Sequence, residues 1–155
     1  MQYDIRKVMV ADLEGLKKVL DSSGLFPPEY LSDMISEYLS NPGSEEIWFT
    51  YVQDSEPIGF GYCVPEKLTD GTYNLLAITV DKISQGNGIG SKMLKYLEDE
   101  LKRQQKRILI VDTSSSEDFV LTRSFYLKAG YTNAATIKDF WKDGEDKVTF
   151  YKRIL

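Results

Sequence analysis

The chain contains no histidine and only one cysteine among its 155 residues. Without histidine, a Ser-His-Asp or Cys-His nucleophile is excluded, and so is a histidine-ligated zinc or haem site. The single cysteine, Cys63, forms neither an internal disulfide nor a four-cysteine metal site, so we expect a reducing, cytoplasmic location and no bound metal. Any proton transfer must therefore use carboxylates, Tyr, Lys, Cys or water.

Long apolar runs and an excess of basic residues are also lacking. No run approaches the roughly 20 residues of a membrane-spanning helix, and the opening MQYDIRKVMV has no signal-peptide apolar block, so we expect no membrane partner. The 19 basic residues against 24 acidic ones give a net charge of −5, which argues against nucleic-acid binding. The length fits a single domain over residues 1–155, because one domain spans about 100–200 residues.

The spacing of apolar residues changes along the chain. Alternation and clusters of aromatic or β-branched residues predict strands at 2–8, 46–53, 58–64, 72–80, 107–111, 131–139 and 146–155. Spacings of three and four predict helices at 12–24, 28–41, 118–129 and from 89 onward. Asp12 is expected to be either the N-cap or an acid in the first turn of the first helix. The order β-α-α-β-β-β-α-β-α-β-β indicates an α/β domain with a mixed sheet covered by helices.

A glycine-rich loop separates the strand at 72–80 from the following helix. Backbone N–H groups at a helix start have no partner within the helix, and they bind phosphate. Gly86, Gly88 and Gly90 let a main chain approach such an anion closely. The Walker pattern does not fit, because Gly90 is followed by Ser91 and Lys92 in the wrong order, and the G-x-G-x-x-G fingerprint fails as well.

The pattern that fits is Q-x-x-G-x-G, with Gln85, Gly88 and Gly90 at the fixed places. It resembles the pyrophosphate-binding loop of the GNAT superfamily of acyl-CoA-dependent N-acyltransferases. The segment AITVD at 77–81 is similar to the strand before that loop, and SFYLKAGY at 124–131 to a second signature of the superfamily. The element order also matches over most of the chain, which implies the mixed, mostly antiparallel sheet of these proteins.

The resemblance implies acetyl-CoA as cosubstrate and assigns residues to it. The main chain of Ile78, Thr79 and Val80 pairs with the pantetheine arm as an added strand would. The pyrophosphate is cradled by the loop and helix start, formed by Gln85, Gly86, Asn87, Gly88, Ile89, Gly90 and Ser91. The alternative is a plain strand-to-helix turn that needs positive φ.

Tyr126 corresponds to the tyrosine that protonates the departing CoA thiolate in many members of the superfamily. A phenol with a pKa near ~10 stays protonated at pH 7 and can hydrogen-bond a thiolate whose thiol has a pKa near ~8.5. The alternative is a core tyrosine on an amphipathic helix.

One departure from the family pattern lies seven residues earlier, where many members carry a cofactor-binding Asn and this chain has Phe119. Thr122 or Arg123 is the expected substitute. Arg123 either reaches the 3′-phosphate of the coenzyme or faces solvent.

The implied reaction is direct attack of a primary amine on the thioester, with a backbone N–H near Ile78 holding the oxyanion. Asp112 is the first candidate for the proton acceptor, because it follows the strand at 107–111. Glu117 and Asp139 are weaker candidates. Cys63 as an acyl-enzyme nucleophile is a further alternative, against a small apolar core residue in GFGYCV.

The acceptor amine is indicated only by charge. Residues 11–46 border the acceptor side in this superfamily, and they carry two lysines and eight acids, a net charge of −6. The acids are Asp12, Glu14, Asp21, Glu29, Asp33, Glu37, Glu45 and Glu46. We hypothesise a cationic small-molecule or peptide amine drawn by this field. The alternative is a solvated helix face.

Two other functions stay open. One is a non-catalytic acyl-CoA sensor, consistent with the missing Asn and the unassigned base. The other is an interaction protein that uses the acidic helices as a docking face. The donor's acyl length is open, and the resemblance includes proteins that dimerise through the final strand pair, so a homodimer is one expectation.

Overall fold

The computed structural model describes residues 3–155, so Gln2, at the start of the first predicted strand, lies outside them. The strands are β1 Tyr3–Lys7, β2 Ile47–Gln53, β3 Glu56–Pro65, β4 Thr72–Val80, β5 Ile108–Ser114, β6 Thr132–Lys142 and β7 Glu145–Arg153. The helices are α1 Leu13–Ser23, α2 Leu31–Ser40, α3 Ile89–Arg103 and α4 Val120–Lys128, with short 3₁₀ turns before α1, α2, α3 and α4. The predicted order of strands and helices is confirmed.

The strands form one sheet in the order β1-β2-β3-β4-β5-β7-β6. β4 and β5 are parallel, whereas β1 with β2, β2 with β3, and β7 with both β5 and β6 are antiparallel. The expected mixed, mostly antiparallel sheet is therefore confirmed. Among residues 3–155, no helix is long and apolar enough to cross a membrane.

The contacts divide the described chain into two compact units. Unit 1 comprises residues 3–64 and Ala77–Asp99, and unit 2 comprises Pro65–Leu76 and Glu100–Leu155. Each unit is built around its own strands, and β4 and α3 each contribute residues to both units.

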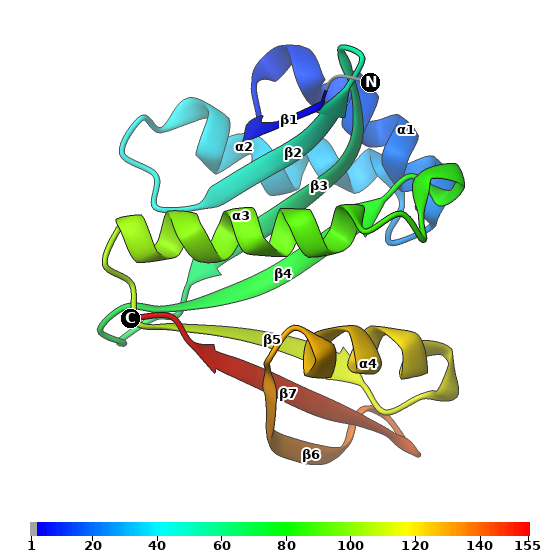
Figure 1. Ribbon diagram of the computed structural model, residues 1–155, viewed down its shortest axis with the longest axis vertical. Helices are drawn as coiled ribbons and strands as arrows, with labels where there is room; N and C mark the ends of the chain where they lie inside the picture. Colours follow the sequence, from blue (N-terminus) through cyan, green and yellow to red (C-terminus); the bar gives the residue numbers. More distant parts are fainter. Residues whose placement is uncertain (1–2) are drawn as a thin grey trace. The chain divides into compact units, whose positions relative to one another are not determined.

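In unit 1, α1 and α2 cover one face of β2 and β3 (Figure 1). Leucines and other apolar residues at helical spacing form the buried side of each helix, and they pack with Trp48 and Phe60 from the strands. Gly24 ends α1 in a left-handed conformation, φ 72°, as its position after the last apolar residue predicts.

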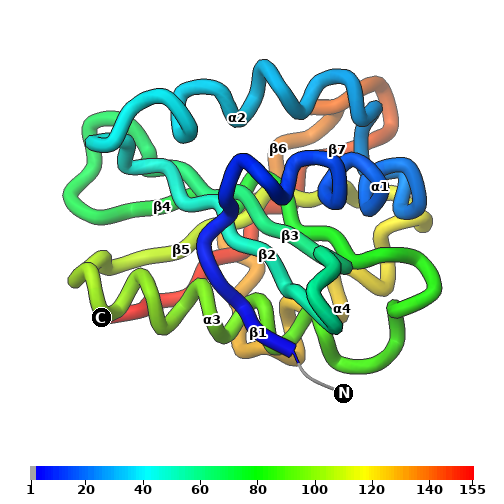
Figure 2. Tube along the Cα trace, turned by 90° about the horizontal axis from the view of Figure 1, so that it is seen from above, coloured from blue at the N-terminus to red at the C-terminus, as the bar shows by residue number. Residues whose placement is uncertain are grey.

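The opposite face of these strands carries α3, so that β2 and β3 lie between α2 and α3 (Figure 2). Successive strand residues point to opposite faces of the sheet. Trp48 therefore faces α1 and α2, and its neighbour Phe49 faces α3. The Phe49 and Tyr96 rings lie 5.5 Å apart. A side chain at Gly59 would come within 3.0 Å of the Met93 sulfur, so a glycine lets α3 approach β3 closely.

In unit 2, α4 lies over β5 and β7 (Figure 1). Val111 of β5 is paired with Phe150 of β7, and the Phe150 ring packs 5.9 Å from that of Tyr126 in α4. β6 forms the edge of the sheet, and all 11 of its residues are exposed. The homodimer expected from the final strand pair stays a prediction.

Two predicted boundaries and one predicted capping role differ from the structure. β5 continues beyond Val111 to Ser114, because its last residues pair with β7. The helix predicted from 118 begins with a 3₁₀ turn and becomes α-helical at Val120. Asp12 is in helical conformation and makes no side-chain hydrogen bond that caps α1. Its carboxylate instead accepts two hydrogen bonds from the Arg6 guanidinium, at 2.8 and 2.9 Å.

Candidate active site

The residues expected to act together fall in both units. Unit 1 holds the segment 78–80 and the glycine-rich loop, and unit 2 holds Asp112, Arg123 and Tyr126. β4 pairs with β5 only at its beginning, from Thr72 with Ile108 to Asn74 with Ile110. The strand itself continues to Val80.

The loop after β4 is held in shape by its own polar side chains. The Gln85 amide donates to the Val80 carbonyl at 2.9 Å, and the Asn87 amide donates to the Ser84 carbonyl at 3.0 Å. Gln85 and Asn87 therefore organise the loop through their side chains. A cofactor can be contacted there by their main chain.

Two glycines give the loop its path. Gly86 and Gly88 have φ angles of 83° and 77°, in the left-handed region that side chains disfavour. A Cβ at either position would meet no atom within 4 Å, so the conformation, and not crowding, requires glycine here. These two angles are also those that the alternative of a plain strand-to-helix turn requires.

The loop leaves a row of hydrogen-bond donors at the start of α3. The first helical bond runs from the Lys92 N–H to the Gly88 carbonyl, at 3.2 Å. Within residues 3–155, the N–H groups from Gly86 to Ser91 donate to no acceptor of the chain. They lie at the positive end of the α3 dipole, which is an arrangement that binds phosphate groups.

Sequence reasoning missed Ser22, which fixes the beginning of this loop. Its hydroxyl donates to the Asp81 carboxylate at 2.6 Å and accepts from the Lys82 N–H at 2.9 Å. A serine in the last turn of an amphipathic helix carries no signal for such a contact 59 residues away, so only the structure identifies it.

Tyr126 is buried in unit 2, with 2% of its surface exposed. Its ring lies among aromatic neighbours, 5.1 Å from Phe125 and 5.6 Å from Tyr131. Burial raises the pKa of its phenol well above 10, so the hydroxyl stays protonated. Tyr126 is thus a core residue whose hydroxyl is a neutral hydrogen-bond donor.

Asp112 lies within β5, not at its end, and its carboxylate is held on several sides. It accepts from the Thr149 hydroxyl at 2.7 Å and from the Asn74 amide at 3.5 Å, and the Lys147 ammonium lies 3.9 Å away. Asp112 is thus a carboxylate with charged and polar partners on the sheet.

Asp139 and Arg123 have structural roles in this fold. The Asp139 carboxylate accepts from the Gly144 N–H at 2.8 Å within the β6–β7 connection. Arg123 does not point into solvent, because its Nη1 donates to the carbonyls of Ser114 and Ser116 at 2.6 and 2.8 Å.

Cys63 is fully buried, and burial raises the pKa of its thiol far above the ordinary value of 9.0. A thiolate nucleophile is therefore disfavoured at Cys63, which favours the apolar core role.

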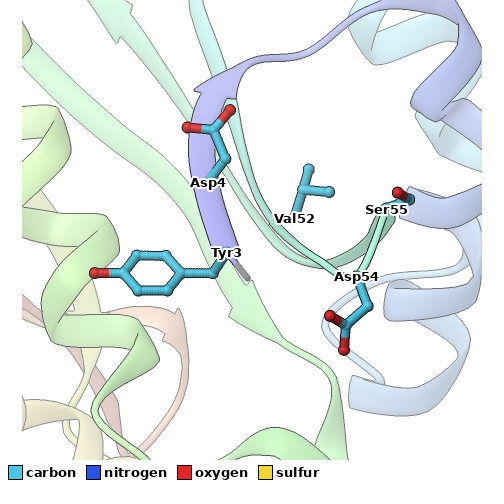
Figure 3. Close-up of a pocket in the computed structure, with 5 residues that line it drawn as sticks. All are labelled: Tyr3, Asp4, Val52, Asp54 and Ser55. Atoms are coloured by element: carbon cyan, nitrogen blue, oxygen red, sulfur yellow. The ribbon is translucent and has the colours of Figure 1, made fainter. Parts of the chain in front are cut away.

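One hollow in unit 1 is unrelated to these residues. It measures about 340 Å³ and is lined by Tyr3, Asp4, Val52, Asp54 and Ser55 (Figure 3). The Tyr3 ring points away from the other lining side chains and carries the Lys92 ammonium 4.5 Å above its centre. Residues 3–155 contain no group of three or more His, Cys, Asp or Glu side chains that could hold a metal ion.

The sequence matches a known family over more than half of its length. The model of the acetyltransferase (GNAT) domain matches residues 44–133. An uncharacterized N-acetyltransferase of Methanocaldococcus jannaschii is 30% identical over 152 residues, which is 96% of this chain and 90% of that protein. The chain therefore belongs to the GNAT acetyltransferase family.

Solved structures share the fold over the whole chain. A putative GNAT acetyltransferase from Desulfovibrio desulfuricans is 26% identical with a TM-score of 0.90, covering 99% of this chain and 100% of that one. An aminoglycoside 6′-N-acetyltransferase complexed with coenzyme A is 19% identical with a TM-score of 0.81, covering 98% and 97%.

Proposed function

We propose that this GNAT acetyltransferase transfers an acetyl group from acetyl-CoA to a primary amine. The observation that carries the proposal is the run of N–H groups from Gly86 to Ser91, which face no acceptor of the described chain at the start of α3. These donors match a diphosphate, which accepts several N–H groups and is favoured by the helix dipole. The coenzyme A complex of a structural neighbour supports the same ligand.

In the proposed complex, the loop holds the diphosphate and β4 holds the pantetheine arm. Main-chain groups of Ile78, Thr79 and Val80 supply strand-like pairing, with the side chains playing no part. Because Gln85 and Asn87 already brace the loop, little ordering is needed on binding. In the proposal, Arg123 contacts the 3′-phosphate through donors other than its Nη1, which donates to the Ser114 and Ser116 carbonyls.

The reaction begins when the neutral amine nitrogen bonds to the thioester carbon, while a backbone N–H near Ile78 holds the oxyanion. The C–S bond then breaks and leaves its electron pair on sulfur. Tyr126 donates its proton to that sulfur, and its oxygen takes up the proton that the attacking nitrogen loses as the amide forms. Its raised pKa makes it a weak acid, so its main contribution is stabilising the developing thiolate.

The amine also loses a proton, since an ammonium has no lone pair with which to attack. An alkylammonium with a pKa near ~10 is only about one part in a thousand neutral at pH 7. We propose Asp112 as the group that accepts this proton, directly or through a water molecule.

The acceptor is proposed to be cationic. Six of the eight acids in residues 11–46 are exposed in unit 1: Glu14, Asp21, Glu29, Asp33, Glu37 and Glu45. Asp12 is buried against Arg6 and so adds little to the field. The remaining exposed charge would raise the local concentration of a polyamine or basic peptide.

Thiol release from acetyl-CoA tests the proposal. We expect the thiol to be released only when an amine is added. The acceptors to compare are polyamines, aminoglycosides and basic peptides on one side and neutral amines on the other. Absence of release with every amine, together with binding of CoA, would instead identify an acyl-CoA sensor. That second function is favoured by one observation, the half-exposed Phe119 at the family's Asn position.

A further inference from the structure

The loop between β4 and α3 is an exposed segment with little packing of its own. Within residues 82–88, every residue except Ser84 is exposed, and the next buried side chain is Ile89, at the start of α3. A segment with so few buried contacts keeps its shape mainly through hydrogen bonds. The direction in which its N–H groups point therefore depends on what holds the ends of the loop.

The beginning of the loop is held by two other elements of unit 1. The Asp81 N–H donates to the Ile58 carbonyl of β3 at 2.7 Å. The Ser22 hydroxyl, in the last turn of α1, donates to the Asp81 carboxylate at 2.6 Å and accepts from the Lys82 N–H at 2.9 Å. In the described chain, these two are the only hydrogen bonds that residues 81–88 make with a side chain of another element. Ser22 thus joins α1 to the loop.

Ser22 is a firm anchor because α1 is fixed in the core of unit 1. Val19 and Leu20, each 1% exposed, belong to the same buried cluster as Trp48 and Phe60. A hydroxyl can donate one hydrogen bond and also accept, and Ser22 uses both functions on consecutive residues. The orientation of its hydroxyl is therefore determined, and with it the direction in which the chain leaves β4.

The adjacent serine has no such role. The Ser23 Oγ is buried, and it has no hydrogen-bond partner among residues 3–155. The two serines are neighbours in the same turn of α1, and only the hydroxyl of Ser22 bonds to the loop. Ser23 is therefore a matched control for Ser22.

We propose that Ser22 is a positioning residue for the binding of coenzyme A. Its hydroxyl fixes the first two residues of the loop and thereby directs the unpaired N–H groups that follow toward the diphosphate. The inference rests on the proposed function, because it assigns a residue that prepares the loop for that cofactor. Ser22 acts through the main chain of the loop. Without its hydroxyl, the loop samples more conformations, and binding must then order it.

The test is calorimetric titration of CoA into the whole protein and three variants. Ser22→Ala removes both hydrogen bonds and should weaken CoA binding about tenfold. Ser23→Ala removes a hydroxyl that has no partner, so it should bind CoA as the wild type does. Ser22→Thr keeps a hydroxyl and should bind CoA within about threefold of the wild type. Equal affinity in Ser22→Ala and Ser23→Ala would overturn the proposal.

A second measurement needs no cofactor. In NMR relaxation of the free protein, the order parameters of the Gly86 and Gly88 amides should fall in Ser22→Ala and stay unchanged in Ser23→Ala. Such a change would show that the hydroxyl of Ser22 restrains the loop before any ligand binds. Order parameters that stay unchanged in Ser22→Ala would show that Ser22 does not position the loop.

These outcomes separate the two proposals. If the wild type binds no CoA, the proposed function fails. If the wild type binds CoA and Ser22→Ala binds it equally well, only the role of Ser22 fails. In steady-state assays of an active protein, Ser22→Ala should raise KM for acetyl-CoA about tenfold and leave kcat and KM for the amine unchanged. A lower kcat with an unchanged KM for acetyl-CoA would contradict a positioning role.

Discussion

At the scale of single residues, the buried pair of Arg6 and Asp12 shows how charge is used for folding. Both oxygens of the Asp12 carboxylate accept from the guanidinium, and one also accepts from the Met9 N–H at 2.7 Å. The hydrogen bond from Arg6, with help from Met9, lowers the pKa of Asp12 below its ordinary value of 3.8. Bidentate hydrogen bonds between a guanidinium and a carboxylate stabilise the folded state more than hydrogen bonds between neutral groups do.

This pair predicts a dependence of stability on acid. A lowered pKa in the folded state means that the stabilisation is fully present above pH 3.8 and is lost as the pH falls through the folded pKa. Asp12→Asn should cost about 1–3 kcal/mol in the free energy of unfolding at pH 7 and much less at pH 2. Urea unfolding of the wild type and the variant at pH 7 and at pH 2 measures this cost. An equal cost at the two pH values would show that the charge of Asp12 does not stabilise the fold.

Tyr126 gives a second prediction at this scale. Tyr126→Phe keeps the ring among Phe125, Tyr131 and Phe150 and removes only the hydroxyl. We expect a similar melting temperature and a kcat lower by about 100-fold. Because burial raises the phenol's pKa above 10, the wild type should lose no activity from Tyr126 ionisation below that pH. A fully active Tyr126→Phe variant would remove this residue from the mechanism.

At the scale of elements, hydrophobic spacing was enough to place the helices and strands. The apolar spacing in α1, α2 and α3 and the β-branched and aromatic residues of β2 and β4 agree with the final packing. The end of β5 could not be predicted, because Asp112, Thr113 and Ser114 are polar and join the strand only through pairing with β7. Long-range pairing decided this boundary against local preference.

The same limit applies to the candidate site. The loop could be predicted, because positive φ and unpaired N–H groups leave a local glycine pattern in the sequence. The contacts of Ser22 with Asp81 and of Asn74 with Asp112 join residues that are 59 and 38 positions apart in the sequence. Such contacts leave no local pattern, so their residues could be found only in the folded chain.

Arg123 provides a prediction at the element scale. It ties the start of α4 to the end of β5 through the Ser114 and Ser116 carbonyls. Arg123→Gln should lower the free energy of unfolding by about 1–3 kcal/mol and speed amide hydrogen exchange in the first turn of α4. If its other donors bind the 3′-phosphate, the variant should also lose the preference for CoA over 3′-dephospho-CoA. Unchanged exchange in α4 would contradict the structural role.

At the scale of the whole molecule, charge is distributed unevenly along the chain. Residues 11–46 carry a net charge of −6, whereas the complete sequence carries −5. The rest is therefore close to neutral. Exposed charges act at a distance only over about a Debye length, ~10 Å at 0.1 M salt.

This asymmetry predicts salt-dependent turnover of cationic acceptors. For a polyamine, kcat/KM should fall several-fold between about 20 and 500 mM salt, because screening removes the attraction. For a neutral amine it should change little over the same range. Equal salt dependence for both acceptors would mean that these acids form only a solvated surface.

We propose that the main chain of the glycine-rich loop binds the diphosphate of coenzyme A. The measurement is calorimetric titration of CoA into the wild type, into the Gly88→Asp variant and into the Gly144→Asp variant, which is the control. Both glycines have a positive φ, 77° and 83°, with no atom within 4 Å of an added Cβ, so the two changes carry the same strain and charge. We predict that Gly88→Asp weakens CoA at least about 100-fold, while Gly144→Asp binds as the wild type does. Equal affinity in the two variants, or no heat with the wild type, would contradict diphosphate binding by this loop.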